Sequence, residues 1–228
     1  MNYADQSMDF QYLDGLESLT LRITGQADQV IAKALSDQVG WKEAEVSQGQ
    51  VRKGDVLFVW PVASTPTRPP LGSKLIDEDA AQWTILTIVR KQHVECWEAG
   101  CRNLAVEAGL TNLVTILHAS YTKSAGGEAV PTWTVLQANV PARIQPASQT
   151  AEILEDADWT RDERRVILQT DVDLELAGAD YRIVDSAGVR YRVVGYQQAQ
   201  RIDELPVAIV VKILEGREGH SSSSSSGA

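Results

Sequence analysis

The chain has 228 residues, of which 43% are hydrophobic and 23% charged, a composition typical of globular proteins that excludes wholesale disorder. Its 31 Asp and Glu exceed its 21 Lys and Arg, giving a net charge of −10, and a negative field disfavours tight electrostatic binding to nucleic acid. Two cysteines are too few for a disulfide framework, no apolar run reaches the roughly 20 residues that span a bilayer, and no signal peptide begins the sequence. We expect a protein without a membrane segment, made in a reducing cytoplasm.

Short runs rich in β-branched and aromatic residues recur along the chain, bounded by glycine, proline or aspartate. Such runs are typical of strands, and prolines between them favour strands over helices. The expected strands are Leu19–Ile23, Val56–Trp60, Trp83–Val89, Leu113–Tyr121, Thr132–Leu136, Val140–Pro146, Arg165–Val172, Tyr181–Val184, Tyr191–Tyr196 and Val207–Leu214.

One segment has a helical pattern. In Asp28–Val39 the residues Val30, Ile31, Ala34 and Leu35 would share one face of a helix. A strand also fits this segment, and the pattern does not decide between the two. We therefore expect at most one or two short helices in the chain.

The sequence repeats itself. The run GLESLTLRIT from Gly15 resembles GLTNLVTILH from Gly109 at an offset of 94, and Leu75–Leu86 aligns with Ile183–Val194 without gaps at an offset of 108. The second pair predicts the same hairpin twice, with Asp at its turn and an aromatic residue entering the core. Two matches in the same order favour internal duplication over chance.

The duplication predicts an all-β, mainly antiparallel fold of two tandem small barrels or sandwiches. We expect residues 1–108 to form the first, degenerate domain, residues 109–215 the second, and the Ser-rich residues 216–228 a disordered tail. The increase in offset predicts an insertion of about 14 residues in the second copy. Its expected place is the highly charged loop 147–165.

No catalytic or metal site is predicted. His93, Cys96 and Cys101 lack the ligand spacing and second pair of a zinc site. The carboxylates of Asp156–Arg165 have only Trp159 as an apolar neighbour, so acid–base chemistry is disfavoured against a solvated, salt-bridged loop. Nucleophile-elbow, P-loop and dinucleotide motifs are absent. We expect no enzyme and no cofactor.

The segment Gly178–Ile213 carries a charged loop, a strand, a hairpin of the form Y-R-I-V-D-x-x-G-V-R-Y-R-V-V-G-Y and a last strand. It resembles the head-closure proteins of tailed bacteriophages, which form the stopper that closes the head–tail connector. The preceding Thr132–Gln149 is similar to the first hairpin of that family, which runs into a segment ending in A-R-I-Q-P and then a long loop. The resemblance covers Leu110–Leu214 and extends to the first half only through the repeat.

The resemblance implies a structural protein of the virion neck. It would form a ring of six or twelve copies below the portal and adaptor and above tail-completion or tail-tube proteins, retaining packaged DNA and letting it pass without tight binding. By the same resemblance the long loop would face the channel or a neighbouring subunit. The residues expected there are Gln149, Glu152, Glu155, Asp156, Asp158, Trp159, Arg161 and Asp162.

Two alternatives remain. One is another phage neck or tail-completion ring protein, the mostly helical adaptors being disfavoured. The other is a ligand-binding β module of carbohydrate type, because tryptophans can stack on sugars, although tryptophans are more often core residues. The six tryptophans are Trp41, Trp60, Trp83, Trp97, Trp133 and Trp159.

Overall fold

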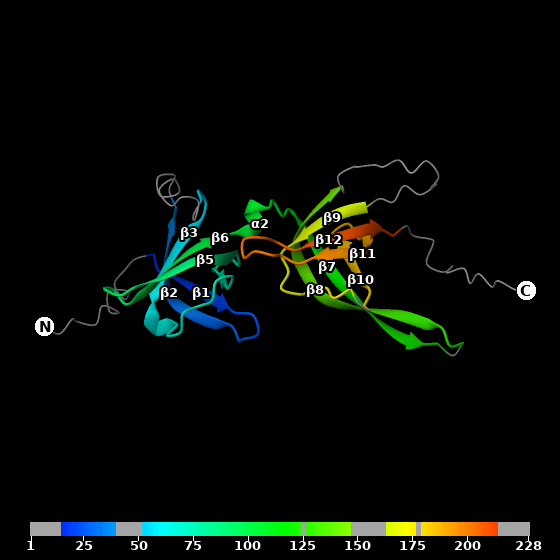
Figure 1. The fold of residues 1–228 in the computed structure, drawn as a ribbon, viewed down its shortest axis with the longest axis horizontal. Helices are drawn as coiled ribbons and strands as arrows, with labels where there is room; N and C mark the ends of the chain where they lie inside the picture. The colour runs from blue at the N-terminus through cyan, green and yellow to red at the C-terminus, as the bar shows by residue number, and fades with distance from the viewer. Residues whose placement is uncertain (1–14, 40–51, 125, 147–162, 177–178, 214–228) are drawn as a thin grey trace, which may run out of the picture. The chain divides into compact units, whose positions relative to one another are not determined.

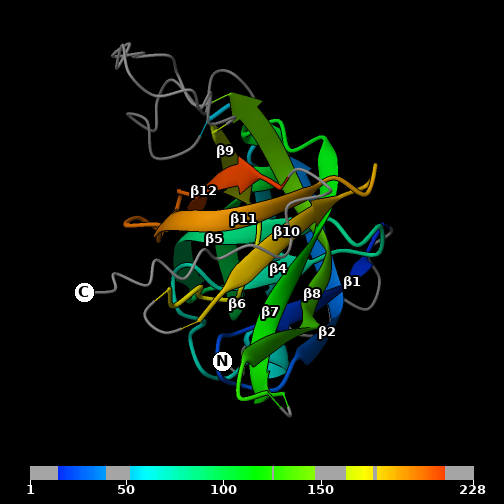
Figure 2. The same ribbon diagram turned by 90° about the vertical axis from the view of Figure 1, so that its right-hand side faces the viewer.

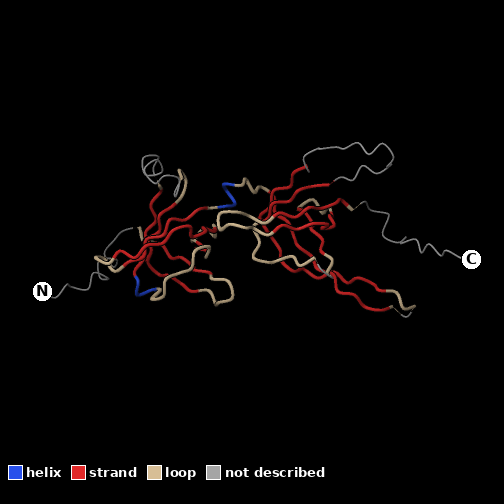
Figure 3. The backbone as a smooth tube through the Cα atoms, in the orientation of Figure 1, coloured by secondary structure: helices blue, strands red, loops and turns tan. Residues whose placement is uncertain are grey.

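The computed structural model describes residues 15–39, 52–124, 126–146, 163–176 and 179–213. Nearly all regular structure in these residues is antiparallel strand, with two short helical segments (Figures 1 and 3). By internal contacts the chain divides into two units, residues 1–110 with 199–205 and residues 111–198 with 206–228. The expected all-β class, with two tandem domains and few helices, is confirmed.

The first unit is a closed barrel of six antiparallel strands in the order β1-β2-β3-β6-β5-β4, with β4 pairing back onto β1. A 3-10 turn, η2 (Val62–Ser64), follows β3, and the short helix α2 (Leu104–Glu107) follows β6. The strands are β1 (Glu17–Arg22), β2 (Gln29–Gln38), β3 (Val56–Pro61), β4 (Lys74–Ile76), β5 (Gln82–Lys91) and β6 (Cys96–Arg102).

Aromatic side chains fill much of the first barrel. Successive side chains of a strand point to opposite faces, so Phe58 and Trp60 of β3 both enter the core, where they are buried. The Trp60 indole N–H donates to the Thr65 hydroxyl at 2.7 Å, which satisfies its polar atom inside the barrel. Burial of a side chain such as Phe58 stabilises the fold by about 1.5–3 kcal/mol.

The second unit is a closed barrel with the same strand order, β7-β8-β9-β12-β11-β10 (Figure 2). Its core is mainly aliphatic, with Ile116, Leu168 and Ile183 fully buried, and Tyr181 and Tyr191 are its buried aromatic side chains. The strands are β7 (Asn112–Lys123), β8 (Ala129–Pro146), β9 (Glu163–Leu168), β10 (Tyr181–Asp185), β11 (Arg190–Gln197) and β12 (Val207–Lys212).

The hairpin predicted to occur twice has the same turn in both barrels. The backbone N–H of Asp77 donates to the carbonyl four residues on at 3.2 Å, and that of Asp185 does so at 3.1 Å. In both turns the aspartate Oδ1 accepts the N–H of that same later residue, at 2.8 and 2.9 Å. The residue three positions after the aspartate has a positive φ, 61° at Ala80 and 80° at Gly188. Shared topology and shared turn geometry both support duplication.

The ambiguous segment Asp28–Val39 forms strand β2, not a helix. Ile31 and Ala34 are both buried although they are three residues apart. The pairing of β1 with β2 shifts between Ala34 and Ile31, which is a β-bulge. A bulge adds a residue to one strand, so it produced the spacing that resembled a helical face.

The offset of 94 for the first strand is wrong by one residue. Leu21 pairs with Leu75 in the first barrel, and Ile116 pairs with Ile183 in the second. Because Leu75 and Ile183 are counterparts in the repeated hairpin, Ile116 is the counterpart of Leu21, and the offset is 95. An offset of 94 would match the buried Leu19 to Leu113, which is 52% exposed. A slip of one residue exchanges the two faces of a strand.

The insertion expected in loop 147–165 lies elsewhere. The hairpin that joins β7 to β8 is the longer one, because Leu21 pairs with Gln29 on β2, whereas its counterpart Ile116 pairs with Gln137, much further along the chain. From this hairpin to β9 the spacing is the same in both barrels. Leu35 pairs with Val59, and Arg143 pairs with Ile167 at an equal separation in sequence. The connection from β8 to β9 is thus as long as its first-barrel counterpart.

Candidate functional site

The predicted channel residues Gln149, Glu152, Glu155, Asp156, Asp158, Trp159, Arg161 and Asp162 lie outside the described residues. Of the expected loop 147–165, residues 163–165 are described, and they begin strand β9. The loop therefore stays a prediction. The candidate site lies instead on the extended hairpin of β7 and β8.

The extended part of the β7–β8 hairpin, Ala119–Trp133, is called the arm. Its two strands pair from Ala119 opposite Trp133 to Lys123 opposite Ala129, and Figure 1 shows them continuing past the barrel. Strand β10 pairs with β7 only as far as His118. Within the described residues no third strand pairs with the arm, so it is a two-stranded ribbon.

Three contacts with β10 and the residue before it fix the base of the arm. The guanidinium of Arg182 lies 4.0 Å from the centre of the Trp133 ring, a cation–π contact. The Tyr121 hydroxyl donates to the Asp180 carboxylate, and this hydrogen bond raises the pKa of Tyr121 above its usual value. The backbone N–H of Ala119 also donates to the Asp180 carbonyl, at 3.0 Å.

A row of paired residues crosses four strands on the outside of the second barrel. Arg192 lies opposite Arg182, Arg182 opposite Leu117, and Leu117 opposite Val135. Their neighbours Ile183 and Ile116 point into the core, so this row faces outward. Trp133 lies two positions from Val135 on β8, and Tyr121 lies four positions from Leu117 on β7. Because side chains alternate between the two faces of a strand, both lie on the same side of the ribbon as this row.

This outer face exposes apolar and cationic side chains together. Val135 is 63% exposed and Tyr121 is 50% exposed. Arg182 and Arg192 lie directly opposite each other, an arrangement of like charges that destabilises a sheet. Asp180 offsets part of the repulsion, because its carboxylate lies 3.7 Å from the Arg192 guanidinium. Exposed Tyr, Trp and Arg are the residue types enriched in protein–protein contacts.

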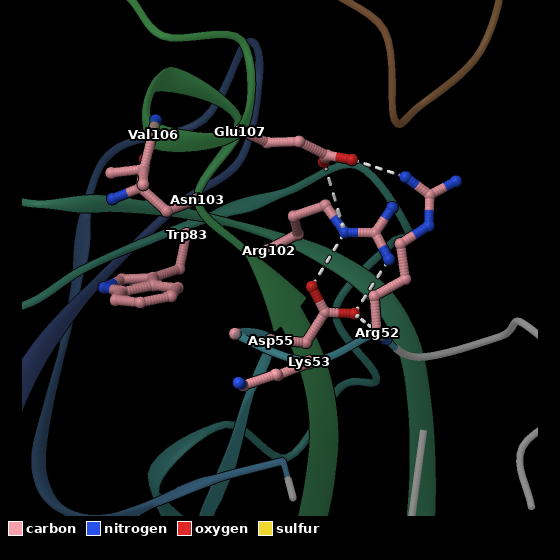
Figure 4. A pocket seen from close by; sticks show the side chains of 9 residues that line it. Arg52, Lys53, Asp55, Trp83, Arg102, Asn103, Val106 and Glu107 are labelled. Atoms are coloured by element: carbon pink, nitrogen blue, oxygen red, sulfur yellow. Dashed lines mark hydrogen bonds and ion pairs between the residues drawn. The ribbon is translucent and has the colours of Figure 1, made fainter. Parts of the chain in front are cut away.

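A second group of polar residues lines a cavity of about 210 Å³ in the first barrel (Figure 4). The buried Asp55 accepts two hydrogen bonds from Arg102, at 2.7 and 2.8 Å. Glu107 of α2 lies 3.4 Å from the same guanidinium and also pairs with Arg52. Hydrogen bonding to Asp55 raises the pKa of Arg102. The carboxylates here are neutralised by arginines, so the cluster attaches α2 to β3 and β6.

The two cysteines considered for metal binding are part of the core, whereas His93 is exposed. Cys96 and Cys101 of β6 are both buried and unpaired in disulfides. Burial raises the pKa of both thiols, which keeps them protonated. Among the described residues no group of three or more His, Cys, Asp or Glu side chains is arranged to hold a metal ion.

The tryptophans give little support to a sugar-binding surface. Trp60 and Trp97 are buried in the first barrel. Trp83 is half-buried and donates its indole N–H to Asp77, while Trp133 packs against Arg182. Trp41 and Trp159 lie outside the described residues.

The sequence did contain a signal for the arm. Gln29 and Ala34 recur as Gln137 and Ala142 at the offset of 108 seen later in the chain. That offset is already established in β8, so the extra residues must precede Gln137. This signal is weak, because the two identical residues are isolated among dissimilar ones.

Residues 108–210 match the model of the phage head completion protein family. The resemblance to the head-closure proteins is confirmed. The match includes the arm and most of the second barrel, and the first barrel shares the strand order but lies outside the match.

No curated protein matches the chain. Among solved structures, the inhibitor of motility of Bacillus subtilis is 11% identical, with 88% of each chain covered and a TM-score of 0.19. That similarity is too low to carry an argument. The described residues contain no helix with the length and apolar character needed to span a bilayer.

Proposed function

We propose that the protein is a structural component of the phage virion that closes the head after DNA packaging, as a ring at the neck between the portal or adaptor and the tail. The observation that carries this proposal is the family match over residues 108–210. Its partners would be its own copies, the portal or adaptor on one side, and tail-completion or tail-tube proteins on the other.

The fold supports a role based on contacts between proteins. The barrels are closed, and the described carboxylate cluster at Asp55 is neutralised by Arg102. The net charge of −10 suits a channel through which DNA moves, because phosphate contacts would otherwise have to be broken in series. The loop 147–165 is proposed, by the resemblance, to face this channel or a neighbouring subunit.

The duplication bears on the number of chains in the proposed ring. Each chain supplies two barrels of one topology, so six chains would present twelve barrels to a partner of twelvefold symmetry. A ring of twelve chains is the alternative. Single-particle images of the assembled ring distinguish the two, and any other ring order contradicts both.

The experiment that tests the function uses particles packaged without a tail. The purified protein is mixed with these particles and imaged by negative stain, alongside the protein alone. Density that caps the portal vertex, together with retention of DNA, is the expected result. A protein that never joins a particle would contradict the proposal.

A further inference from the structure

We propose that the open edge of β7 in the arm binds an added β-strand, and that this strand is the N-terminal segment, residues 1–14, of a neighbouring copy of the chain. The open edge is formed by the backbone N–H and C=O groups of Tyr121 and Lys123. The proposal rests on the neck-ring function and names a contact that would join neighbouring subunits.

The arm is a sheet that lacks a strand on one side. Strand β10 pairs with β7 from Val114 to His118, and the carbonyl of Asp180 then accepts the N–H of Ala119 at 3.0 Å. Beyond that contact the described residues provide no third strand next to β7, as Figure 1 shows. A two-stranded ribbon is only marginally stable in water, so a further strand in line with β10 would stabilise the arm.

Hydrogen bonds at the two ends of the arm show which backbone groups of β7 are open. The Ser124 N–H donates across the hairpin to the Glu128 carbonyl at 2.8 Å, whereas the Ala119 N–H points the other way, to the β10 side. Backbone groups alternate between the two edges of a strand. Tyr121 and Lys123 therefore direct their N–H and C=O groups away from β8, to the side where the described residues place no strand.

The β8 edge of the arm is blocked. Pro131 lies opposite Tyr121, and Ala129 lies opposite Lys123, so the backbone at these two β8 positions faces away from β7. Proline has no N–H to donate to an added strand. Because proline occupies the middle of the β8 edge and no proline occupies the β7 edge, strand addition is directed to β7.

The sequence identifies the occupant. Met8, Phe10 and Tyr12 alternate with Asp9 and Gln11, a pattern typical of a strand with one apolar and one polar face. No other segment outside the described residues has three large apolar side chains in strict alternation with polar ones. Of the segments that could supply a strand to the arm, residues 1–14 therefore carry the strongest signal.

The two faces of β7 match the two faces of this segment. Tyr121, which is 50% exposed, lies on one face of the strand, and Ser120 and Thr122 lie on the other. An added strand could thus place its apolar side chains beside the Tyr121 ring and its polar side chains beside the two hydroxyl groups. Cross-strand pairs of these kinds stabilise a sheet.

Charge permits the same pairing. Residues 1–14 contain Asp5, Asp9 and Asp14 and no Lys or Arg. Strands β7 and β8 contain Lys123 and Arg143 and no Asp or Glu. Like charges directly opposite each other destabilise a sheet, and the acidic segment meets none on the strand that it would join.

Donation between copies suits a ring. The N-terminal segment leads into β1 of the first barrel, whereas the acceptor edge belongs to the second barrel. Each copy thus carries one donor and one acceptor, and the contact is head-to-tail. Head-to-tail contacts close into rings when their rotation permits, whereas pairing of two β7 edges would join only two copies.

A photo-cross-linking amino acid in place of Phe10 tests the proposal in the full chain. Unlabelled and isotope-labelled copies are mixed, concentrated and irradiated, and the adducts are analysed by mass spectrometry. We expect adducts that join one copy of each kind, with the attachment on the arm strand at residues 119–123. The same attachment is expected on tailless particles.

Matched proline variants test the edge. Lys123→Pro removes an outward N–H from β7 and should lower the adduct yield about tenfold, because an added strand loses a backbone hydrogen bond. Ala129→Pro places the same residue directly opposite, on the β8 edge, and should leave the yield unchanged. Circular dichroism checks that both variants fold. If Lys123→Pro does not fold, Tyr12→Asp in the donor segment replaces it, with the same loss expected.

The outcomes separate this proposal from the proposed function. Adducts within single copies only, adducts attached outside the arm or to another virion protein alone, no adducts, or a yield that Lys123→Pro does not lower would overturn the interface. Particle capping would then stand by itself. If two copies cross-link at the arm but never join particles, the neck function fails and the interface stands.

Discussion

The carboxylate of Asp77 accepts a hydrogen bond from the indole N–H of Trp83 at 2.7 Å. The same relationship recurs at the equivalent turn of the second barrel, where the Tyr191 hydroxyl donates to Asp185 at 3.3 Å. Trp83 and Tyr191 hold equivalent places in β5 and β11. A turn residue is thus bound to the strand that follows it in both barrels, although the aromatic partner differs.

The aspartate should matter more than its aromatic partner. Oδ1 of Asp185 accepts the backbone N–H groups of Ala187 and Val189, both at 2.9 Å. Asp185→Ala would leave these donors without that acceptor, and we expect a loss of about 1–3 kcal/mol in the free energy of unfolding. Tyr191→Phe removes the longer bond, at 3.3 Å, and we expect it to cost less than the loss of Asp185. Urea denaturation of the full chain measures both, and equal effects would contradict the ranking.

The ion pair between Asp55 and Arg102 predicts a large effect of single substitutions. Their side chains are 3% and 6% exposed. Asp55→Ala would leave a buried, less compensated guanidinium, and removal of one partner of such a pair costs about 3–5 kcal/mol. The double variant Asp55→Leu/Arg102→Met should be less destabilised than either single variant. Urea denaturation followed by circular dichroism checks the order, and additive losses would contradict it.

The first barrel should lose stability at alkaline pH. Burial raises the pKa of Cys96 and Cys101 in the folded state above their ordinary values. The folded state therefore keeps protons that the unfolded chain releases, and stability falls once the pH rises past the ordinary thiol pKa of about 8.5. Urea midpoints at increasing pH should decline, and Cys101→Ala should weaken the decline. A midpoint that stays constant to about pH 10 would contradict this expectation.

The same burial predicts slow thiol chemistry at neutral pH. Only thiolates react readily, and both sulfurs lie in the core. We expect a disulfide reagent to label neither cysteine of the native protein over minutes, and to label both in urea. Rapid labelling of the native protein would show that β6 opens.

The arm should be dispensable for folding. The first barrel closes the equivalent hairpin with a short turn, in which Arg22 binds Asp28 through paired contacts at 2.8 and 3.0 Å. Replacement of the arm by residues 23–28 removes a cation–π contact worth about 0.5–1 kcal/mol and two hydrogen bonds to Asp180 worth about 0.5–1.5 kcal/mol each, and the second barrel should still fold. Thermal denaturation measures this, and a second barrel that fails to fold would contradict it.

How far the sequence predicted this molecule depends on the kind of signal. Alternation and prolines were sufficient for the β class, and the run at Leu75–Leu86 identified the repeated hairpin, because a tight turn constrains consecutive residues. The segment Asp28–Val39 stayed undecided because its bulge is a property of pairing with β1, and pairing partners are not visible in one strand alone.

The candidate site was harder to predict than the fold. The arm arises from the length of one hairpin, which the pairing of Gln137 with Ile116 shows directly and which the sequence marks only by two isolated identities. The outer face needs the register of four strands, which brings Arg192, Arg182 and Val135 into one row from distant parts of the sequence. Sequence motifs favoured charged loops instead, because runs of charge stand out without any knowledge of pairing.

Two barrels of one topology in a single chain carry a folding hazard, since a strand of one half can be taken up by the other. The cores oppose this exchange. Trp60 in β3 occupies the place that Leu168 takes in β9, and Phe58 occupies that of Val166. Strand β3 in the second barrel would be overpacked, and β9 in the first would leave a void, each at a cost of kilocalories per mole. Because the two cores differ in side-chain volume, each half of the duplicated chain pairs with its own strands rather than with those of the other half.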